Sequence, residues 1–357
     1  MDELADLTRH LVAIPSHEDE SAAGDAIETW LRAETDGAVT RDATGNVIAR
    51  KGSGSSLALV GHHDVVPPDE SQVGQDGDYV VEERDGRLYG RGTADMKGAV
   101  AAAMLAFRDA DPAGELVFAS FVGEELGGVG ARAAIDDGFT PDYAIVGEGS
   151  TDYSKPGVTD VVVAHKGRRA VTITAHGTAA HASEPEAGEN AIYRATDAVD
   201  IVRDLAAPTV DVFGESVTGS VVATEIDGGS AWNVIPERCT VTVDERTVPG
   251  ERADLDRVET IEGVTWTVDQ DLPPMRCDDE AFAEGVRRAT ASAQSGSPEL
   301  VSKPHATDAG WLAGAGTTCV ICGPAERGEA HTANESVSLD VLERCYRIYL
   351  AAADRLP

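Results

Sequence analysis

The sequence predicts an α/β fold, in which helices flank a mixed, mostly parallel sheet and a smaller α+β domain is inserted into the chain. Three observations lead to this prediction. Short, continuously apolar segments alternate with helical segments near both ends of the chain. The middle is instead rich in Val and Thr with partial alternation. The length of 357 residues suits about two domains.

The larger domain begins with two segments, 2–14 and 20–34, whose apolar residues have helical spacing. Continuous apolar runs are typical of strands buried on both faces, and they cover residues 57–60, 116–122, 143–146 and 317–322. Further helical segments lie at 97–109, 128–137 and 280–293. This alternation of strands and helices predicts an α/β sheet.

The middle of the chain has a different pattern. Residues 158–176 and 217–246 alternate in part, as strands of a half-exposed sheet do, and 189–205 has helical spacing. We therefore expect a catalytic domain in two parts with an inserted domain between them, at residues 1–164, 165–277 and 278–357.

The charge is strongly negative, with 63 Asp and Glu against 29 Lys and Arg, a formal net charge of −34. Such a field excludes ordinary binding to nucleic acids and to anionic membranes. Five of the 29 basic residues are Lys, and the 42% hydrophobic content is enough for a folded core. Many acidic residues together with few Lys predict a halophilic protein from an acidic proteome.

We expect a cytoplasmic protein. No segment approaches the ~20 apolar residues of a membrane span, and residues 1–20 lack the basic and apolar regions of a signal peptide. The five cysteines do not form a disulfide framework. Cys319 and Cys322 lie in an apolar strand, where residues three apart point to opposite faces, so this pair is predicted to be structural.

Three apolar runs are followed by a glycine and then by a His or a carboxylate: His62, the pair Glu124–Glu125, and Glu148. In open α/β sheets, ligands bind beyond the carboxyl ends of the strands. The same geometry brings these residues together, although they are far apart in the sequence.

Two further residues add to this set. Asp95 lies in a glycine-rich loop that opens a helix, and His331 lies in a polar loop after the last apolar run. Gathered carboxylates raise one another's pKa unless a cation neutralises them. Imidazole and carboxylate ligands suit zinc and its neighbours. The sequence therefore predicts a divalent metal site.

The motifs of this chain resemble those of the di-zinc metallopeptidases, a family that includes acetylornithine deacetylase, succinyl-diaminopimelate desuccinylase, aminoacylase and glutamate carboxypeptidase. They cover nearly the whole chain: His62-His63-Asp64-Val65-Val66-Pro67, Gly90-Arg91-Gly92-Thr93-Ala94-Asp95-Met96-Lys97-Gly98, Glu124-Glu125, Gly147-Glu148, His181-Ala182-Ser183 and His331-Thr332-Ala333-Asn334-Glu335. The first two motifs are most similar to those of the deacetylase and desuccinylase branch. The resemblance implies a zinc-peptidase-like catalytic domain and an inserted lid or dimerisation domain.

The resemblance also implies two metal sites. Asp95 would bridge two divalent ions, His62 and Glu148 would complete one site, and Glu125 and His331 would complete the other. Zn²⁺ is the expected ion, and Co²⁺ or Mn²⁺ also suits these ligands.

The catalytic residues implied by the resemblance are Glu124, Asp64 and His181. Asp64 would orient the imidazole of His62. Glu124 would act as general base on a water that two metal ions acidify, and would pass the proton to the leaving amine. His181 would stabilise the developing oxyanion, and in dimeric members the partner subunit supplies this residue.

The expected substrate is a small N-acyl amino acid or a dipeptide with a free carboxylate. Asn233 and Arg246 match groups that hold the substrate's carbonyl and carboxylate, and an Arg fork is the natural partner of a carboxylate. Thr307 and Asp308 occupy a loop that contributes to the pocket in relatives. The inserted domain is expected to form a homodimer or to act as the lid of a monomer.

The chain departs from the family at Gly149-Ser150, where relatives often have Pro followed by Thr or Ser, so the loop should be less rigid. His63 is expected to face away from the metals, and His305 is a candidate pocket residue.

Other functions are disfavoured. A dinucleotide site would use the glycines of Gly128-Val129-Gly130-Ala131-Arg132-Ala133, but Glu124 and Glu125 would repel the pyrophosphate. A non-catalytic relative would usually lack a metal ligand or the base, and all are present. A dipeptidase or carboxypeptidase of the same family remains an alternative.

The charge gives a testable prediction. Mutual repulsion of the acidic side chains should unfold the protein at low ionic strength, and salt should screen it. We expect the melting temperature to rise between low and molar KCl, as measured by circular dichroism. A melting temperature that stays constant over this range would contradict salt adaptation.

Overall fold

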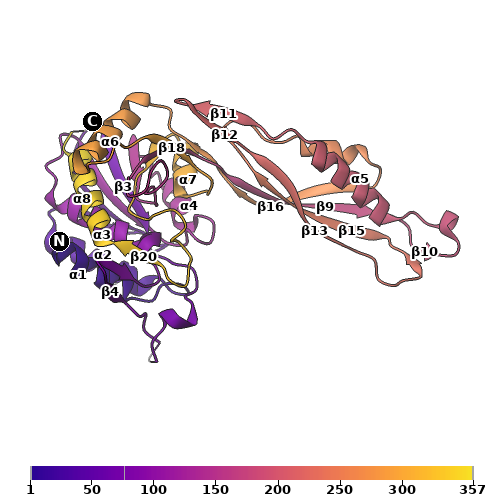
Figure 1. The fold of residues 1–357 in the computed structure, drawn as a ribbon, viewed down its shortest axis with the longest axis horizontal. Helices are drawn as coiled ribbons and strands as arrows, with labels where there is room; N and C mark the ends of the chain where they lie inside the picture. Colours follow the sequence, from indigo (N-terminus) through magenta and orange to yellow (C-terminus); the bar gives the residue numbers. More distant parts are fainter. Residues whose placement is uncertain (1, 76, 356–357) are drawn as a thin grey trace. The chain divides into compact units, whose positions relative to one another are not determined.

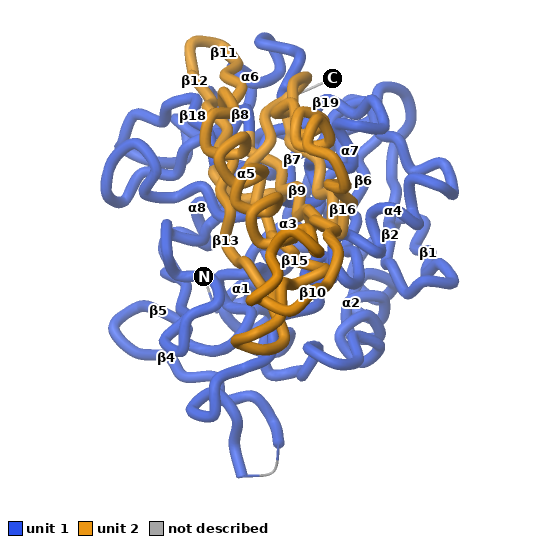
Figure 2. The backbone as a smooth tube through the Cα atoms, turned by 90° about the vertical axis from the view of Figure 1, so that its right-hand side faces the viewer, with its two compact units in different colours: residues 1–164, 276–303, 307–357 blue, residues 165–275, 304–306 orange. Residues whose placement is uncertain are grey.

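The computed structural model describes residues 2–75 and 77–355. It divides into two compact units, which Figure 2 shows in different colours. Unit 1 comprises residues 1–164, 276–303 and 307–357, and unit 2 comprises residues 165–275 and 304–306. The chain therefore passes into the second unit after residue 164, returns at residue 276, and contributes residues 304–306 to the second unit once more.

Unit 1 is built on a mixed nine-stranded sheet (Figure 1). Its main path is β1 (Ala38–Arg41), β2 (Val47–Gly52), β6 (Glu115–Phe121), β3 (Ser56–His62), β7 (Tyr143–Val146), β19 (Thr318–Ile321), β8 (Val161–His165) and β17 (Met275–Arg276), and β18 (Leu300–Lys303) pairs with β8. The four strands from β6 to β19 run parallel to one another. A small sheet joins β20 (Ser336–Ser338), β5 (Arg87–Tyr89) and β4 (Glu82–Arg84).

The central strands are apolar because both of their faces are covered. Every residue of β3 is buried, as are all but the first residues of β6 and β7. The helices of this unit are α1 (Asp2–Val12), α2 (Ser21–Glu34), α3 (Gly98–Asp109), α4 (Val129–Asp136), α6 (Glu280–Ala293), α7 (Asp308–Gly314) and α8 (Leu339–Ala353). The small side chains of the Ala-rich α3 let it pack against β3, β6 and α8 at once.

Unit 2 has a four-stranded antiparallel sheet and one long helix. The strands are β13 (Ser220–Gly228), β15 (Arg238–Arg246), β9 (Arg168–His176) and β16 (Val264–Leu272), and the helix is α5 (Ala191–Asp204). Alternate residues of β9 and β15 are buried beneath α5, whereas most of β13 and β16 is exposed. Two short antiparallel pairs complete the unit, β10 (Ala180–His181) with β14 (Val234–Ile235), and β11 (Thr209–Val212) with β12 (Glu215–Thr218).

The predicted fold class is confirmed, and each segment predicted as a helix or strand corresponds to an element of the structure, but the helix α8 and the strand β16 were not predicted. Cys319 and Cys322 are buried thiols, and their sulfur atoms lie 3.4 Å from the carbonyl oxygen of Thr317 and 3.7 Å from Oγ1 of Thr290, respectively. Over the part of the chain that the structure describes, no helix combines the length and the apolar character needed to traverse a bilayer.

Candidate metal centre

The first group of candidate ligands lies at the carboxyl ends of three neighbouring strands. β6, β3 and β7 are parallel, and His62 at the end of β3 is in register with the last residue of β6. Glu124 and Glu148 follow β6 and β7 by two or three residues. His62, Glu124 and Glu148 can each offer a ligand atom, and these atoms lie within 4.8 Å of one another.

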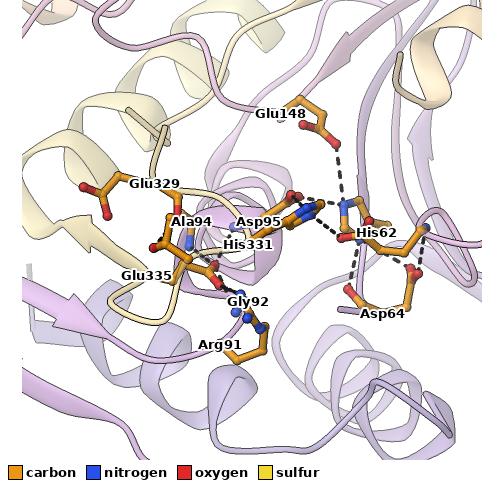
Figure 3. A network of polar contacts seen from close by, with 12 residues as sticks. His62, Asp64, Arg91, Gly92, Ala94, Asp95, Glu148, Glu329, His331 and Glu335 are labelled. Carbon is orange, nitrogen blue, oxygen red and sulfur yellow. Dashed lines mark hydrogen bonds and ion pairs between the residues drawn. The ribbon is translucent and has the colours of Figure 1, made fainter. Parts of the chain in front are cut away.

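Asp95 joins this group to a second one (Figure 3). Its Oδ1 lies 3.1 Å from Nε2 of His62, and its Oδ2 lies 3.0 Å from Nε2 of His331. Nε2 of His331 is also 2.9 Å from Oε1 of Glu125. Asp95, Glu125 and His331 form the second group with ligand atoms within 4.8 Å. One carboxylate therefore lies between two imidazoles.

Asp64 fixes the segment that carries the two adjacent glutamates. Its two carboxylate oxygens accept hydrogen bonds from the backbone N–H groups of Glu124 and Glu125, at 3.1 and 3.0 Å. Its Oδ1 also lies 3.4 Å from Nδ1 of His62, but the nearer partner of Nδ1 is the backbone carbonyl of Asp64 at 3.0 Å. A proton on Nδ1 that donates to this carbonyl leaves Nε2 available as a ligand atom.

Burial and the charges of neighbouring side chains shift the pKa of His62, Asp95 and Glu124. Burial opposes a charge on His62, but Asp64, Asp95 and Glu148 together raise its pKa well above the ordinary value. Burial likewise opposes ionisation of Asp95, and hydrogen bonds from the two imidazoles outweigh it and lower its pKa. Burial raises the pKa of Glu124, and nearby carboxylates add to this shift. Fixed cations would relieve this repulsion.

The donor set fits two divalent ions. Each group combines an imidazole nitrogen with carboxylate oxygens, and the two oxygens of Asp95 approach different imidazoles. Nitrogen and oxygen ligands of this kind suit zinc, cobalt and manganese. The structure therefore brings all five predicted metal ligands together, and it places Glu124 in the first group with His62 and Glu148.

Sequence reasoning missed Lys303, which lies beside Glu148. Its Nζ is 2.9 Å from Oε2 of Glu148, and the two side chains are only 8% and 10% exposed. The other oxygen, Oε1, lies 3.5 Å from Nε2 of His62. Lys303 thus holds one oxygen of Glu148 and leaves the other towards the site. The only signal in the sequence that could have pointed to Lys303 was that Lys is rare in this chain.

Hydrogen bonds and close backbone packing hold Gly149 and Ser150, which follow Glu148. Ser150 donates from its backbone N–H to Gly323 at 3.2 Å and from its hydroxyl to the carbonyl of Asp160 at 2.8 Å. A Cβ at Gly149 would lie 2.8 Å from the carbonyl oxygen of Ala325, so close backbone packing excludes a side chain here. Hydrogen bonds and close packing therefore fix this segment, although the sequence predicts a less rigid loop here.

The predicted pocket residues of unit 1 begin α7. Oγ1 of Thr307 accepts a hydrogen bond from the backbone N–H of Ala309 and caps the helix. Asp308 is buried, and neither carboxylate oxygen has a hydrogen-bond partner among the described residues. Burial raises the pKa of Asp308 to about 7. The carboxyl group of Asp308 is therefore protonated more readily than that of an ordinary aspartate.

The predicted substrate residues of unit 2 lie at two places. His181, on β10, is exposed, and its Nδ1 accepts a hydrogen bond from the backbone N–H of Ser183 at 3.2 Å. The carbonyl of Asn233 accepts one from Ala182 at 2.9 Å, so His181 and Asn233 belong to the same pair of segments. Arg246 ends β15 and forms an ion pair with Asp244 at 2.7 Å.

His63, His305 and the glycines of the apparent dinucleotide motif complete the candidates from the sequence. Nδ1 of His63 lies 2.8 Å from the hydroxyl of Ser120 on β6, and burial lowers the pKa of His63 to about 3. His305 is exposed and belongs to unit 2. The glycines of the apparent dinucleotide motif have a structural function, because a Cβ at Gly130 would lie 2.3 Å from Oδ1 of Asn46.

The sequence matches the profile of peptidase family M20/M25/M40 over residues 58–355. The chain belongs to this family. An acetylornithine deacetylase of Myxococcus xanthus is 30% identical over 334 residues, which are 86% of this chain and 83% of that protein. A succinyl-diaminopimelate desuccinylase of Stenotrophomonas maltophilia is 30% identical over 387 aligned residues and is matched over 100% of both chains. The predicted resemblance is confirmed.

Solved structures share the fold. Aminopeptidase PepT of Bacillus cereus has a TM-score of 0.82 at 21% identity, covering 99% of this chain and 97% of that one. The YXEP protein of Bacillus subtilis, described as a dinuclear metal binding peptidase from the M20 family, has a TM-score of 0.71 at 18% identity, covering 98% and 96%. Family membership, with deacylases as relatives, makes the chain a hydrolase of amide bonds.

The buried ion pair of Lys303 gives a prediction. Replacing Lys303 by Met leaves the carboxylate of Glu148 without its cation, which should cost about 3–5 kcal/mol of unfolding free energy in metal-free protein. Excess Zn²⁺ should reduce this loss, because the metal supplies a new cation. Denaturant unfolding in molar KCl measures both values.

The control is Lys155→Met, because Lys155 forms an exposed pair with Glu299 at 2.7 Å. Exposed pairs contribute at most about 1 kcal/mol, and Zn²⁺ should not change the effect. An equal loss in the two variants would contradict a special function of Lys303.

Proposed function

We propose that the protein is a metal-dependent deacylase that hydrolyses the amide bond of a small N-acyl amino acid, as an acetylornithine deacetylase or a succinyl-diaminopimelate desuccinylase does. The observation that carries this proposal is the position of Asp95 between His62 and His331, each with a further carboxylate alongside. Family membership and the two deacylase relatives support it.

Five residues would hold the two ions. Asp95 would be shared between them, His62 and Glu148 would complete one site, and Glu125 and His331 would complete the other. When bound, a pair of divalent ions polarises the substrate carbonyl and acidifies water. Zn²⁺ is the ion that these ligands favour, with Co²⁺ and Mn²⁺ as alternatives.

Glu124 is the proposed general base. Glu124 belongs to the first group with His62 and Glu148. With Asp95, His62 and Glu148 as the ligands of that site, it would remain beside the metal as a carboxylate that is not a ligand. A carboxylate that is not required as a ligand can take a proton from the attacking water and deliver it to the leaving amine. Asp64 supports this step, since it holds the backbone N–H groups of both Glu124 and Glu125.

His181 is the proposed oxyanion-stabilising residue. Because a backbone N–H can only donate, the hydrogen bond from Ser183 requires a free lone pair on Nδ1. The neutral imidazole then carries its proton on Nε2, where it can donate to a developing oxyanion. Asn233 in the neighbouring segment would hold the substrate's carbonyl group.

Arg246 would bind the substrate's carboxylate, and Thr307 with Asp308 would line the pocket. Arg246 donates to Asp244 through Nε and Nη2 and is partly exposed. On a chain with a net charge of −34, an anionic substrate needs a local cation.

The length of β15 separates the two substrate-binding regions of unit 2. β14 ends three residues before β15, so His181 and Asn233 lie near Arg238, whereas Arg246 is at the other end. Eight residues of strand span about 25 Å, which exceeds a small N-acyl amino acid. We therefore propose a homodimer formed through unit 2. In this dimer, one subunit supplies His181 to a bound substrate and the other subunit supplies Arg246 to the same substrate.

A hydrolysis panel tests the substrate class. In molar KCl with added Zn²⁺ or Co²⁺, we expect a higher kcat/KM for acetylornithine, succinyl-diaminopimelate or acetylated neutral amino acids than for dipeptides. The methyl ester of the best substrate should lose at least about tenfold in kcat/KM, because Arg246 then lacks an anionic partner. Preference for dipeptides would instead support the dipeptidase or carboxypeptidase alternative.

Mixed dimers test the catalytic residues and their origin. Glu124→Gln and His181→Ala should each reduce kcat by at least about a hundredfold, while the protein keeps its metal content. If His181 acts in the partner's site, a dimer of one subunit of each kind has one site with both residues intact. After exchange of subunits at equal amounts, we expect about a quarter of the wild-type rate.

Recovery should not occur when two preparations of the same variant are mixed. A mixture of the two variants that stays inactive, although size measurements show mixed dimers, would contradict the supply of His181 by the partner. Full activity of Glu124→Gln would contradict its function as the base.

A further inference from the structure

We infer that Glu335 is a positioning residue of the metal centre, because its buried carboxylate joins the loop that carries Asp95 to the turn that carries His331. The inference rests on the proposed dinuclear site. Glu335 is 1% exposed and lies four residues after His331 in the sequence (Figure 3).

One oxygen of Glu335 organises the backbone ahead of α3. Oε1 accepts hydrogen bonds from the backbone N–H groups of Gly92, Ala94 and Asp95, each at 3.0 Å. Three convergent N–H groups form a site for an anion. The backbone from Gly92 to Asp95 therefore takes its conformation around this oxygen.

The second oxygen has a different partner. Oε2 accepts from Nη1 of Arg91 at 2.6 Å, and the side chains of Arg91 and Glu335 are 4% and 0% exposed. The backbone carbonyl of Glu335 also accepts from the N–H of Gly90 at 3.1 Å. The charge of Glu335 is thus fully paired in the interior, so this carboxylate serves structure and does not need a metal.

The turn that carries His331 is closed separately. The carbonyl of Glu329 accepts from the hydroxyl of Thr332 at 2.9 Å, and Oε2 of Glu329 accepts from the backbone N–H and the hydroxyl of Ser336 at 3.2 and 3.1 Å. Glu329 therefore stabilises the turn, and its Oε1 also lies 3.8 Å from Nη2 of Arg87 on β5, whereas Glu335 contacts the loop of Asp95.

The contacts predict a specific loss. Because Asp95 contacts both imidazoles, a shift of its backbone should weaken both metal sites together. Disturbing only the turn of His331 should weaken the second site alone. Residues that orient metal ligands typically change affinity by about 10–100-fold.

The first variant is Glu335→Ala, with Glu329→Ala as the matched control. We expect Glu335→Ala to lower the affinity of both Zn²⁺ sites by at least about tenfold, as measured by competition with a chromophoric chelator. In metal-free protein, the amides of Gly92, Ala94 and Asp95 should lose protection from hydrogen exchange. Glu329→Ala should affect one site at most and leave these amides protected.

The second test separates the hydrogen bonds from the charge. In Glu335→Gln the amide oxygen can still accept from the three N–H groups, but the NH₂ group opposes the guanidinium of Arg91. Adding Arg91→Met removes that conflict. We expect the double variant to recover most of the amide protection and metal affinity that Glu335→Gln loses, even if Glu335→Ala does not fold.

The possible results are distinguishable. Wild-type protein that binds fewer than two Zn²⁺ ions would contradict the proposed centre and, with it, this inference. Two tight sites in wild type that persist in Glu335→Ala with protected amides would overturn the function of Glu335 alone. A double variant no better than Glu335→Gln would also overturn it.

Discussion

The constraint on which the site depends is the convergence of negative charge around Asp95. This carboxylate lies between His62 and His331, and Glu125 and Glu148 approach the same imidazoles. Such a group is costly in the interior unless cations neutralise it. Three features hold these side chains in place: the parallel strands, the loop before α3, and the buried ion pairs around the site.

The net charge of −34 therefore has two components. Most acidic side chains belong to the surface, where salt can screen them. A few belong to the centre, where two divalent ions would offset much of their charge, so the loaded enzyme would be less negative than its sequence. The few Lys residues fit this division, because Lys303 is buried against Glu148, while Lys97 is buried and donates to the carbonyl of Ile14 at 2.6 Å.

Sequence reasoning predicted the features that follow from periodicity and from the ends of parallel strands. His62, Glu124 and Glu148 could be placed together because consecutive apolar runs predict a buried parallel sheet, whose carboxyl ends share one edge. The positions of Lys303 and Glu335 could not be predicted, because their partners depend on packing between segments distant in the sequence. The strand β18 and the helix α7 were missed because neither is long enough to show a clear period, whereas the longer helix α8 and strand β16 were missed although their length would allow one.

The most direct test of the dinuclear centre is anomalous X-ray diffraction from crystals of the Zn²⁺-loaded protein at the zinc edge. We expect two peaks separated by about 3.5–4 Å, on either side of the carboxylate of Asp95. One should lie about 2.0–2.2 Å from ligand atoms of His62 and Glu148, and the other at the same distance from Glu125 and His331. A single peak, or peaks away from Asp95, would contradict a dinuclear centre at Asp95.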